Sequence, residues 1–122
     1  MIAALDAAYR GDQAFAAAVF FNIWTDQHPA RVAAAAAPAG AYEPGAFYKR
    51  ELAVLLAALS RCDGMPDALV IDGYVWLAGG AAGLGGRLFA ALDERIPVIG
   101  VAKTRLRGDD WSSPVTRGRS AA

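Results

Sequence analysis

Hydrophobic positions along this chain first follow the spacing of strands, and later alternate between the spacings of helices and strands. Three apolar stretches come first, separated by turn-forming residues, and the clearest helical pattern follows them. The expected order is strand, strand, strand, helix, strand, helix, strand. In chain order, the expected ranges are Ile2–Tyr9, Gln13–Trp24, Arg31–Ala37, Ala46–Cys62, Asp67–Asp72, Leu84–Ile96 and Pro97–Lys103.

A meander of strands followed by alternating helices and strands predicts an α/β layer fold with a mixed sheet. The third strand, Arg31–Ala37, is predicted from its place in this order, since a run of alanines by itself favours helix. Pro29 precedes it and limits it to a sheet edge or to the residues that follow.

Three carboxylates stand at apolar positions of this pattern. Asp6 lies inside the first strand, and Asp72 closes the strand in the centre of the sequence. Glu51 shares one side of the first helix with apolar residues three, four and seven positions away. Burial of an unpaired carboxylate costs on the order of several kcal/mol of folding free energy, because the ion loses its hydration. Each of these three carboxylates therefore needs a partner. One alternative is that each is separately capped, paired or solvated at the end of its element.

The other alternative is a shared site. Neighbouring strands with a helix packed across them could bring Asp6, Glu51 and Asp72 into one cluster. Such a cluster, without a matching buried lysine or arginine, repels itself. A hard divalent cation, Mg²⁺ or Mn²⁺, relieves this repulsion. The residue pattern therefore predicts a cation site.

Four segments carry a resemblance to a known family: LDAAY, YEPGAFYKRE, ALVIDGYVWL and IPVIGVAKTRLRG. In this order and spacing they resemble endonuclease V, a family of metal-dependent nucleases that recognise deoxyinosine. The resemblance implies a ribonuclease H-like three-layer α/β domain with a mixed central sheet, spanning residues 1–122. Members usually continue through a further strand and helix, so we expect this domain to lack them.

The resemblance also implies catalytic roles. Asp6, Asp72 and Glu51 match the family's metal-binding acids, the same three that the hydrophobic pattern selects, and Lys103 matches its active-site lysine. Hydrolysis of a phosphodiester needs a nucleophilic water and stabilised phosphoryl oxygens, and a carboxylate-bound Mg²⁺ or Mn²⁺ supplies both. The expected activity is cleavage of DNA, or alternatively RNA, near inosine.

A further set of residues matches the family's substrate contacts. Tyr42 matches a loop of the family that inserts a wedge into the duplex beside the damaged base, so that the base is exposed. The residues expected to bind substrate are Tyr42, Pro44, Gly45 and Gly73. Tyr74 and Val75 follow Gly73 where most members have a histidine–glycine pair, which changes the expected contacts to the base.

Composition narrows the remaining choices. The chain has 122 residues, 56% of them hydrophobic, and a formal net charge of zero, so any site for a polyanion must be local. Its single cysteine, Cys62, fits a reducing compartment, and no apolar stretch reaches the length of about 18 residues that a membrane span needs. We expect a cytoplasmic protein.

Two competing functions remain. The chain could be a catalytically impaired nucleic-acid-binding or structural remnant of the same fold. It could also bind a small molecule through the glycine-rich stretch Gly79–Arg87, but this stretch lacks the Gly-Lys-Ser/Thr ending of a phosphate loop. We expect it to be a flexible lead-in to the second helix. Metal binding at the acids separates these functions.

Overall fold

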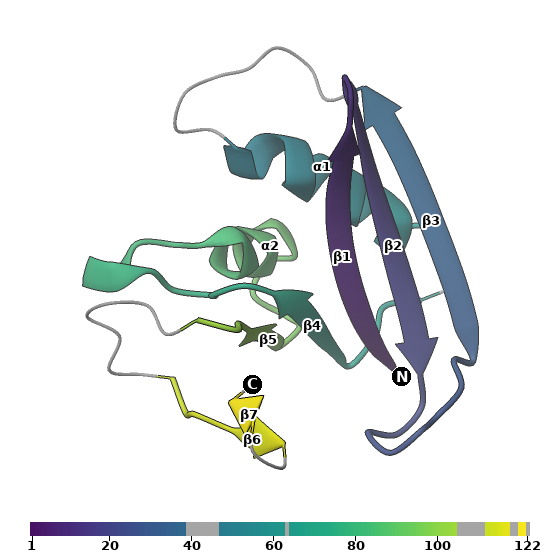
Figure 1. The fold of residues 1–122 in the computed structure, drawn as a ribbon. Coiled ribbons are helices and arrows are strands. Elements are labelled where there is room, and N and C mark those ends of the chain that lie inside the picture. The colour runs from purple at the N-terminus through teal and green to yellow at the C-terminus, as the bar shows by residue number, and fades with distance from the viewer. Residues whose placement is uncertain (39–46, 63, 105–111, 118–119, 122) are drawn as a thin grey trace.

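A five-stranded mixed sheet forms the centre of the protein (Figure 1). The structure is a computed structural model that describes residues 1–38, 47–62, 64–104, 112–117 and 120–121. Its strands are β1 (Ile2–Arg10), β2 (Gln13–Phe21), β3 (Arg31–Pro38), β4 (Ala68–Asp72) and β5 (Val98–Val101), in the spatial order β3-β2-β1-β4-β5. The first three strands are antiparallel neighbours, and β4 runs parallel to both β1 and β5. The predicted α/β fold with a mixed sheet is confirmed.

The remaining elements are helices and one short hairpin. They are α1 (Phe47–Leu59), the short 3₁₀ helix η1 (Ala78–Gly80), α2 (Leu84–Ala91), and the strands β6 (Thr116–Arg117) and β7 (Ser120–Ala121). Neither α1 nor α2 has the length and apolar character needed to cross a bilayer, and no other helix of the described residues has them.

Two of the predicted elements extend further along the chain than the observed helix and strand do. The second helix was expected to reach Ile96 but ends at Ala91. Asp93 and Glu94 have φ angles of 58° and 57°, a left-handed conformation that cannot continue a right-handed helix. The second strand ends at Phe21, before Trp24, because Asp26 accepts backbone hydrogen bonds from Asn22 and Ile23 and turns the chain there.

The alanine-rich strands hold their place through packing. Along β2, residues Ala14, Ala16, Ala18 and Phe20 are buried, and the residues between them are not. This alternation puts one side of the strand against α1 and the other side away from it. Burial in a sheet therefore overrides the helical preference of alanine, and the predicted third strand forms as β3 at the sheet edge.

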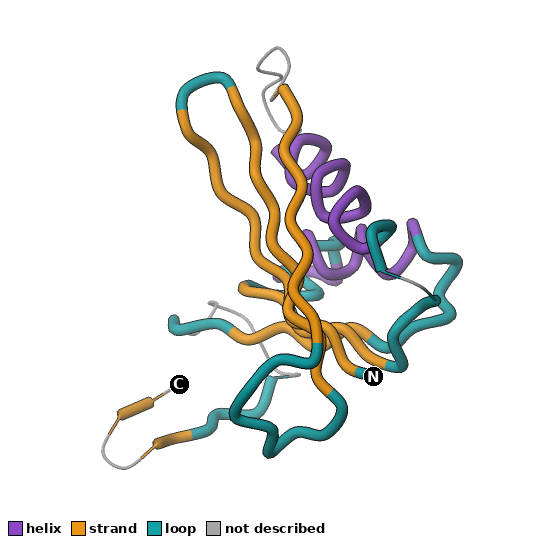
Figure 2. Tube along the Cα trace, turned by 90° about the vertical axis from the view of Figure 1, so that its right-hand side faces the viewer, coloured by secondary structure: helices purple, strands orange, loops and turns teal. Residues whose placement is uncertain are grey.

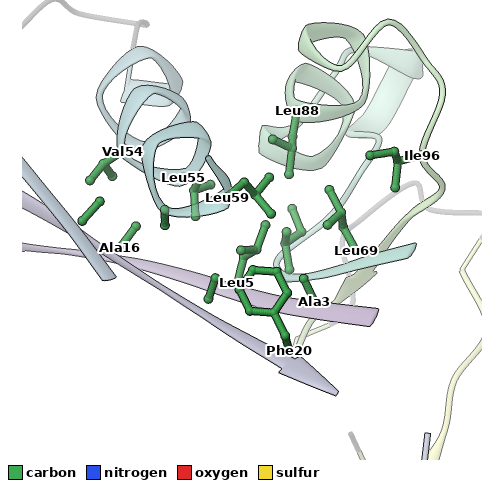
Figure 3. Close-up of a cluster of buried hydrophobic side chains, with 14 of the residues drawn as sticks. Ala3, Leu5, Ala16, Phe20, Val54, Leu55, Leu59, Leu69, Leu88 and Ile96 are labelled. Atoms are coloured by element: carbon green, nitrogen blue, oxygen red, sulfur yellow. The ribbon is translucent and has the colours of Figure 1, made fainter. Parts of the chain in front are cut away.

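The hydrophobic core lies between the sheet and the two helices (Figure 3). Its largest fully buried side chains include Phe20 from β2, Leu55 and Leu59 from α1, Leu69 from β4 and Leu88 from α2. Burial of each such side chain stabilises the fold by roughly 1.5–3 kcal/mol. These residues fix α1 across β1 and β2, which decides where Glu51 lies.

Both helices lie on the same face of the sheet (Figure 2). In the residues that the structure describes, the opposite face has no helix. The described part thus supplies two layers, the sheet and one layer of helices, out of the three that the sequence led us to expect.

The glycine-rich stretch is packed against its neighbours, in contrast to the expected flexible lead-in. A side chain at Gly86 would place its Cβ 2.8 Å from the Val75 carbonyl oxygen, and one at Gly85 would lie 2.9 Å from the Ile71 side chain. The Val75 carbonyl also accepts hydrogen bonds from the N–H groups of Gly83 and Gly86, at 2.9 and 3.1 Å. Glycine is needed here for close approach, which rigidly attaches the start of α2 to the end of β4.

Candidate functional site

The first two acids of the candidate site are brought together by the pairing of β1 and β4. These parallel strands pair Leu5 with Ile71, so the next step in register sets Asp6 beside Asp72. Neighbouring strands lie about 4.8 Å apart. Both aspartates are exposed, and the Asp6 Oδ1 accepts a hydrogen bond of 2.9 Å from the Ala7 N–H. Asp72 ends its strand, as is typical of a site at the carboxyl edge of a sheet.

The third acid approaches from the helix layer. Glu51 lies in the first turns of α1 and is partly buried. A cavity of about 250 Å³ joins it to the aspartates. The cavity is lined by Leu5, Asp6, Ala7, Glu51, Leu55, Ile71, Asp72 and Leu84. The structure therefore brings the three predicted acids to one pocket.

The electrostatics of the pocket act mainly on Glu51. Burial raises the pKa of its carboxyl group above the ordinary value of 4.5, a hydrogen bond with the Tyr9 side chain opposes the rise, and the negative charge of Asp6 adds to it. None of the described lining residues is a lysine, arginine or histidine. The pocket is therefore acidic and carries repulsion between its carboxylates.

The donor chemistry of the pocket fits a hard divalent cation, because carboxylate oxygens are the preferred ligands of Mg²⁺ and Mn²⁺. The present side-chain directions do not converge. Within the described residues, no three Asp, Glu, His or Cys side chains are placed so that they could hold one ion. Strand alternation gives the reason: Leu5 and Ile71 point to α1, so Asp6 and Asp72 point to the other face, while Glu51 comes from the helix side. A shared ion would require other side-chain rotamers of these three acids.

A second and larger cavity has a volume of about 520 Å³ and is lined by residues that adjoin those of the first cavity in the sequence. Asp72 lines the first cavity, and the next residue, Gly73, lines the second. Residues 73–75, 99–104 and 112–116 form its walls. The segments are tied together by the Gly73 N–H, which donates to the Val101 carbonyl at 2.7 Å, and by the Tyr74 hydroxyl, which donates to the Thr104 carbonyl at 2.9 Å.

Lys103 lies in this second cavity, two residues beyond the end of β5. It is exposed, and it is not among the residues that line the acidic pocket. Val101, two residues before Lys103, pairs with Asp72 of the neighbouring strand β4. Lys103 therefore directly follows the strand beside the one that ends in Asp72. The other predicted substrate residues, Tyr42, Pro44 and Gly45, lie outside the described residues.

Sequence reasoning missed Tyr9. This residue follows Asp6 by three positions, an odd spacing, and therefore lies on the opposite face of β1, the face that α1 covers. Its hydrogen bond to Glu51 links the strand to the helix at the rim of the site. A tyrosine at an odd spacing from a predicted strand carboxylate is the signal that could have pointed to it.

Comparison with known proteins identifies the family. The Endonuclease V family model matches residues 1–121. The chain belongs to the endonuclease V family. A relative from Geotalea uraniireducens, "Endonuclease V", is 38% identical over 117 residues, which are 96% of this chain and 49% of the relative. One from Thermus thermophilus is 34% identical over 125 residues, 99% of this chain and 53% of the relative. The chain spans about half the length of the curated relatives it matches.

Solved structures agree with this assignment. The crystal structure of the endonuclease V from Streptomyces avermitilis superposes with a TM-score of 0.73 at 32% identity, and the match covers 84% of this chain and 45% of that one. The Bacillus subtilis endonuclease V gives a TM-score of 0.64 at 19% identity, which shows the fold alone. The ribonuclease H-like fold expected from the sequence is confirmed.

Proposed function

We propose that the chain carries the acid cluster of a metal-dependent endonuclease, which hydrolyses a phosphodiester bond of a nucleic-acid strand near inosine. One observation carries this proposal: three acids from two strands and a helix line one pocket in a member of the endonuclease V family. The relatives are named as endonuclease V enzymes. The proposed compartment is the cytoplasm, in line with the single free cysteine.

In this proposal, Asp6, Asp72 and Glu51 would hold Mg²⁺ or Mn²⁺, which would supply an activated water and charge stabilisation for the phosphoryl oxygens. The Ala7 N–H holds one oxygen of Asp6, and Tyr9 holds Glu51. Lys103 adds a positive charge beside the acids and attracts the phosphate. The acidic pocket by itself repels a polyanion, and the positive charge of Lys103 offsets part of this repulsion.

The second cavity is the proposed site of the base. Gly73 begins it one residue after Asp72, which would place a flipped base directly beside the cleaved strand. Its lining is mainly apolar, with Lys103 and several hydroxyl side chains in the walls, and suits a flat heterocycle taken out of the stack. Tyr42, with Pro44 and Gly45, is proposed to enter the duplex and fill the gap that the base leaves.

A catalytically impaired nucleic-acid-binding remnant is the second candidate. One observation favours it: among the described residues, the side chains of the three acids do not converge on one point. This candidate predicts binding to inosine-containing strands without cleavage.

Strand cleavage decides between the two. Inosine-containing DNA and RNA should be incubated with the chain, with and without Mg²⁺, next to the variant Asp72→Asn. Loss of the charge should lower cleavage by on the order of 100-fold or more, comparable to loss of another charge-stabilising group. Asp93→Asn is the matched control, because Asp93 is exposed beyond the end of α2. Binding without cleavage by the unaltered chain would support the remnant.

A further inference from the structure

The outer edge of β3 is the longest unpaired strand edge in the described part of the protein (Figure 1). β3 has eight residues, whereas β5, the strand at the opposite edge of the sheet, has four. No strand among the described residues pairs with the side of β3 that faces away from β2. Every second residue of such an edge directs its N–H and C=O groups outward, where they can form hydrogen bonds with a further strand.

The sequence of β3 lacks the features with which most proteins protect a strand edge. These features are lysine side chains, a proline within the strand, or a β-bulge. The five residues from Ala33 to Ala37 are all alanine. Arg31 and Pro38 stand at the two ends of the strand, and its pairing with β2 runs one to one without a bulge. Methyl side chains therefore leave the outward backbone groups accessible along the whole middle of the strand.

Packing against the helix layer holds this edge in place. Ala35 is buried, Ala33 packs against the core, and α1 contacts β3 on this side. The side chains between them alternate to the other face of the sheet, where Val32, Ala34 and Ala36 are exposed. A partner strand would add to an edge that is already formed, which lowers the entropic cost of association.

We propose that the outer edge of β3 is an interface with a second copy of this chain, in which the two β3 strands pair antiparallel about a two-fold axis. The strand is complementary to itself, and this property favours a second copy over an unrelated strand. The proposal goes beyond the proposed function, because neither metal nor nucleic acid takes part in it.

The backbone determines which residue lies on the axis. Opposite residues of an antiparallel pair have their side chains on the same face, so the axis must pass through a residue that pairs with its own counterpart. With Ala34 on the axis, the segment Arg31–Ala37 pairs with the same segment of the second copy. Pro38, which has no N–H group, then lies outside the ladder. An axis through Ala35 would bring this proline into the ladder.

Charge and side-chain size agree with an axis at Ala34. The only charged residue of β3 is Arg31, and its two copies lie at opposite ends of the interface, so like charges do not meet. Val32 lies opposite Ala36 of the second copy, which sets a large side chain beside a small one. No side chain of the segment therefore opposes the pairing.

Sedimentation velocity of the 122-residue chain over a wide range of concentrations tests the association. We expect a monomer–dimer equilibrium. Ala34→Lys should weaken the dimer by about tenfold or more, because two ammonium groups then face each other across the axis. Ala34 is exposed, so the monomer should stay folded and melt as before.

Val19→Lys is the matched control for the charge. Val19 is 36% exposed on the same sheet face as Ala34, but it lies on β2, one strand away from the edge. This substitution should change the dissociation constant by less than about twofold, the usual effect of a surface change outside an interface. It would disrupt a dimer formed by stacking of the two sheet faces.

Disulfide trapping tests the register and does not depend on a charge. Cys62→Ala removes the native thiol, and Ala34→Cys or Ala36→Cys is then added to it. The two copies of residue 34 have Cα atoms about 4.5–5.5 Å apart in the proposed register, within the range of about 4.4–6.8 Å for a disulfide. The two copies of residue 36 are separated by four residues along the strand, roughly 14 Å. Ala34→Cys should therefore form a covalent dimer on oxidation, and Ala36→Cys should stay monomeric.

Three results would overturn the proposal. The first is a monomer at every concentration. The second is an equal loss of the dimer with Val19→Lys, which would move the interface to the sheet face. The third is equal crosslinking of the two cysteine variants, which would show that the strands do not pair about Ala34. Nuclease activity enters none of these measurements, so a failure of the proposed function would leave their result standing.

Discussion

At the scale of single residues, the candidate site is a balance between burial and repulsion at Glu51. Asp6 and Asp72 are exposed and solvated, whereas Glu51 on α1 is partly buried and lies near the negative charge of Asp6. Tyr9 is the only described side chain that is seen to favour the charged form of Glu51. We therefore expect the pH dependence of stability at this site to come mainly from the Glu51 carboxyl group.

Stability without metal should fall as pH rises through the titration of Glu51. Its pKa is raised in the folded protein above the ordinary value of 4.5, so the folded state binds more protons than the unfolded state between these two pKa values. Glu51→Gln should remove this decline and raise the melting temperature at pH 7 in EDTA, while leaving it unchanged below pH 4.5. Circular dichroism melts from pH 4 to 8 would measure it. Parallel curves for both proteins would contradict the assignment.

Loss of the Tyr9 hydroxyl should weaken cation binding. Tyr9→Phe removes the hydrogen bond to Glu51, so the carboxylate is less well held and its charged form less favoured. We expect Mn²⁺ affinity, measured by calorimetry, to drop about threefold to tenfold, in line with the net loss of about 0.5–1.5 kcal/mol that is typical for one hydrogen bond. Tyr74→Phe is the control, because its hydroxyl donates to the Thr104 carbonyl away from the acids. Equal losses in both variants would point to a general effect on folding.

At the scale of elements, the strands built from β-branched and aliphatic residues were predictable, and the three predicted acids line one pocket without converging on one point. Asp6 and Asp72 sit on such strands, and Glu51 sits on a helix that must cross them. The sequence did not reveal that strand alternation turns the aspartates away from α1, because the face that each strand presents depends on long-range packing. The end of α2 at Ala91 was also hidden, since it depends on left-handed residues that propensities do not specify.

The glycines before and within α2 lead to a prediction about packing. Gly86→Ala should destabilise the protein by about 1–3 kcal/mol, the usual range for overpacking, although alanine is the better helix former by about 1 kcal/mol. The new Cβ would lie 2.8 Å from the Val75 carbonyl oxygen and 3.0 Å from the Ala82 Cβ. Urea unfolding would measure the change. Ala90→Ser adds one heavy atom at an exposed position of the same helix and should have little effect.

At the scale of the whole molecule, an apolar sheet face occurs on a protein with no net charge. Electrostatic repulsion between copies is therefore weakest near the sequence pI of about 6.5. We expect the isolated chain to aggregate most readily near this pH, and the double substitution Val32→Lys with Ile99→Lys to suppress aggregation. Light scattering against pH and concentration would show it. Unchanged scattering by the double variant would show that the chain aggregates through another surface.

The central position of β1 also has a consequence in time. The strand β1 is synthesised just before β2 and can pair with it at once through a tight turn, but its other edge stays unpaired until Ala68 and the rest of β4 have emerged. At ordinary rates of translation, this delay is on the order of several seconds. During it, β1 bears unpaired backbone groups along the edge that later pairs with β4. Asp6 then lies on an open edge with no neighbouring carboxylate. Repulsion between the acids of the site therefore arises only after β4 has paired with β1.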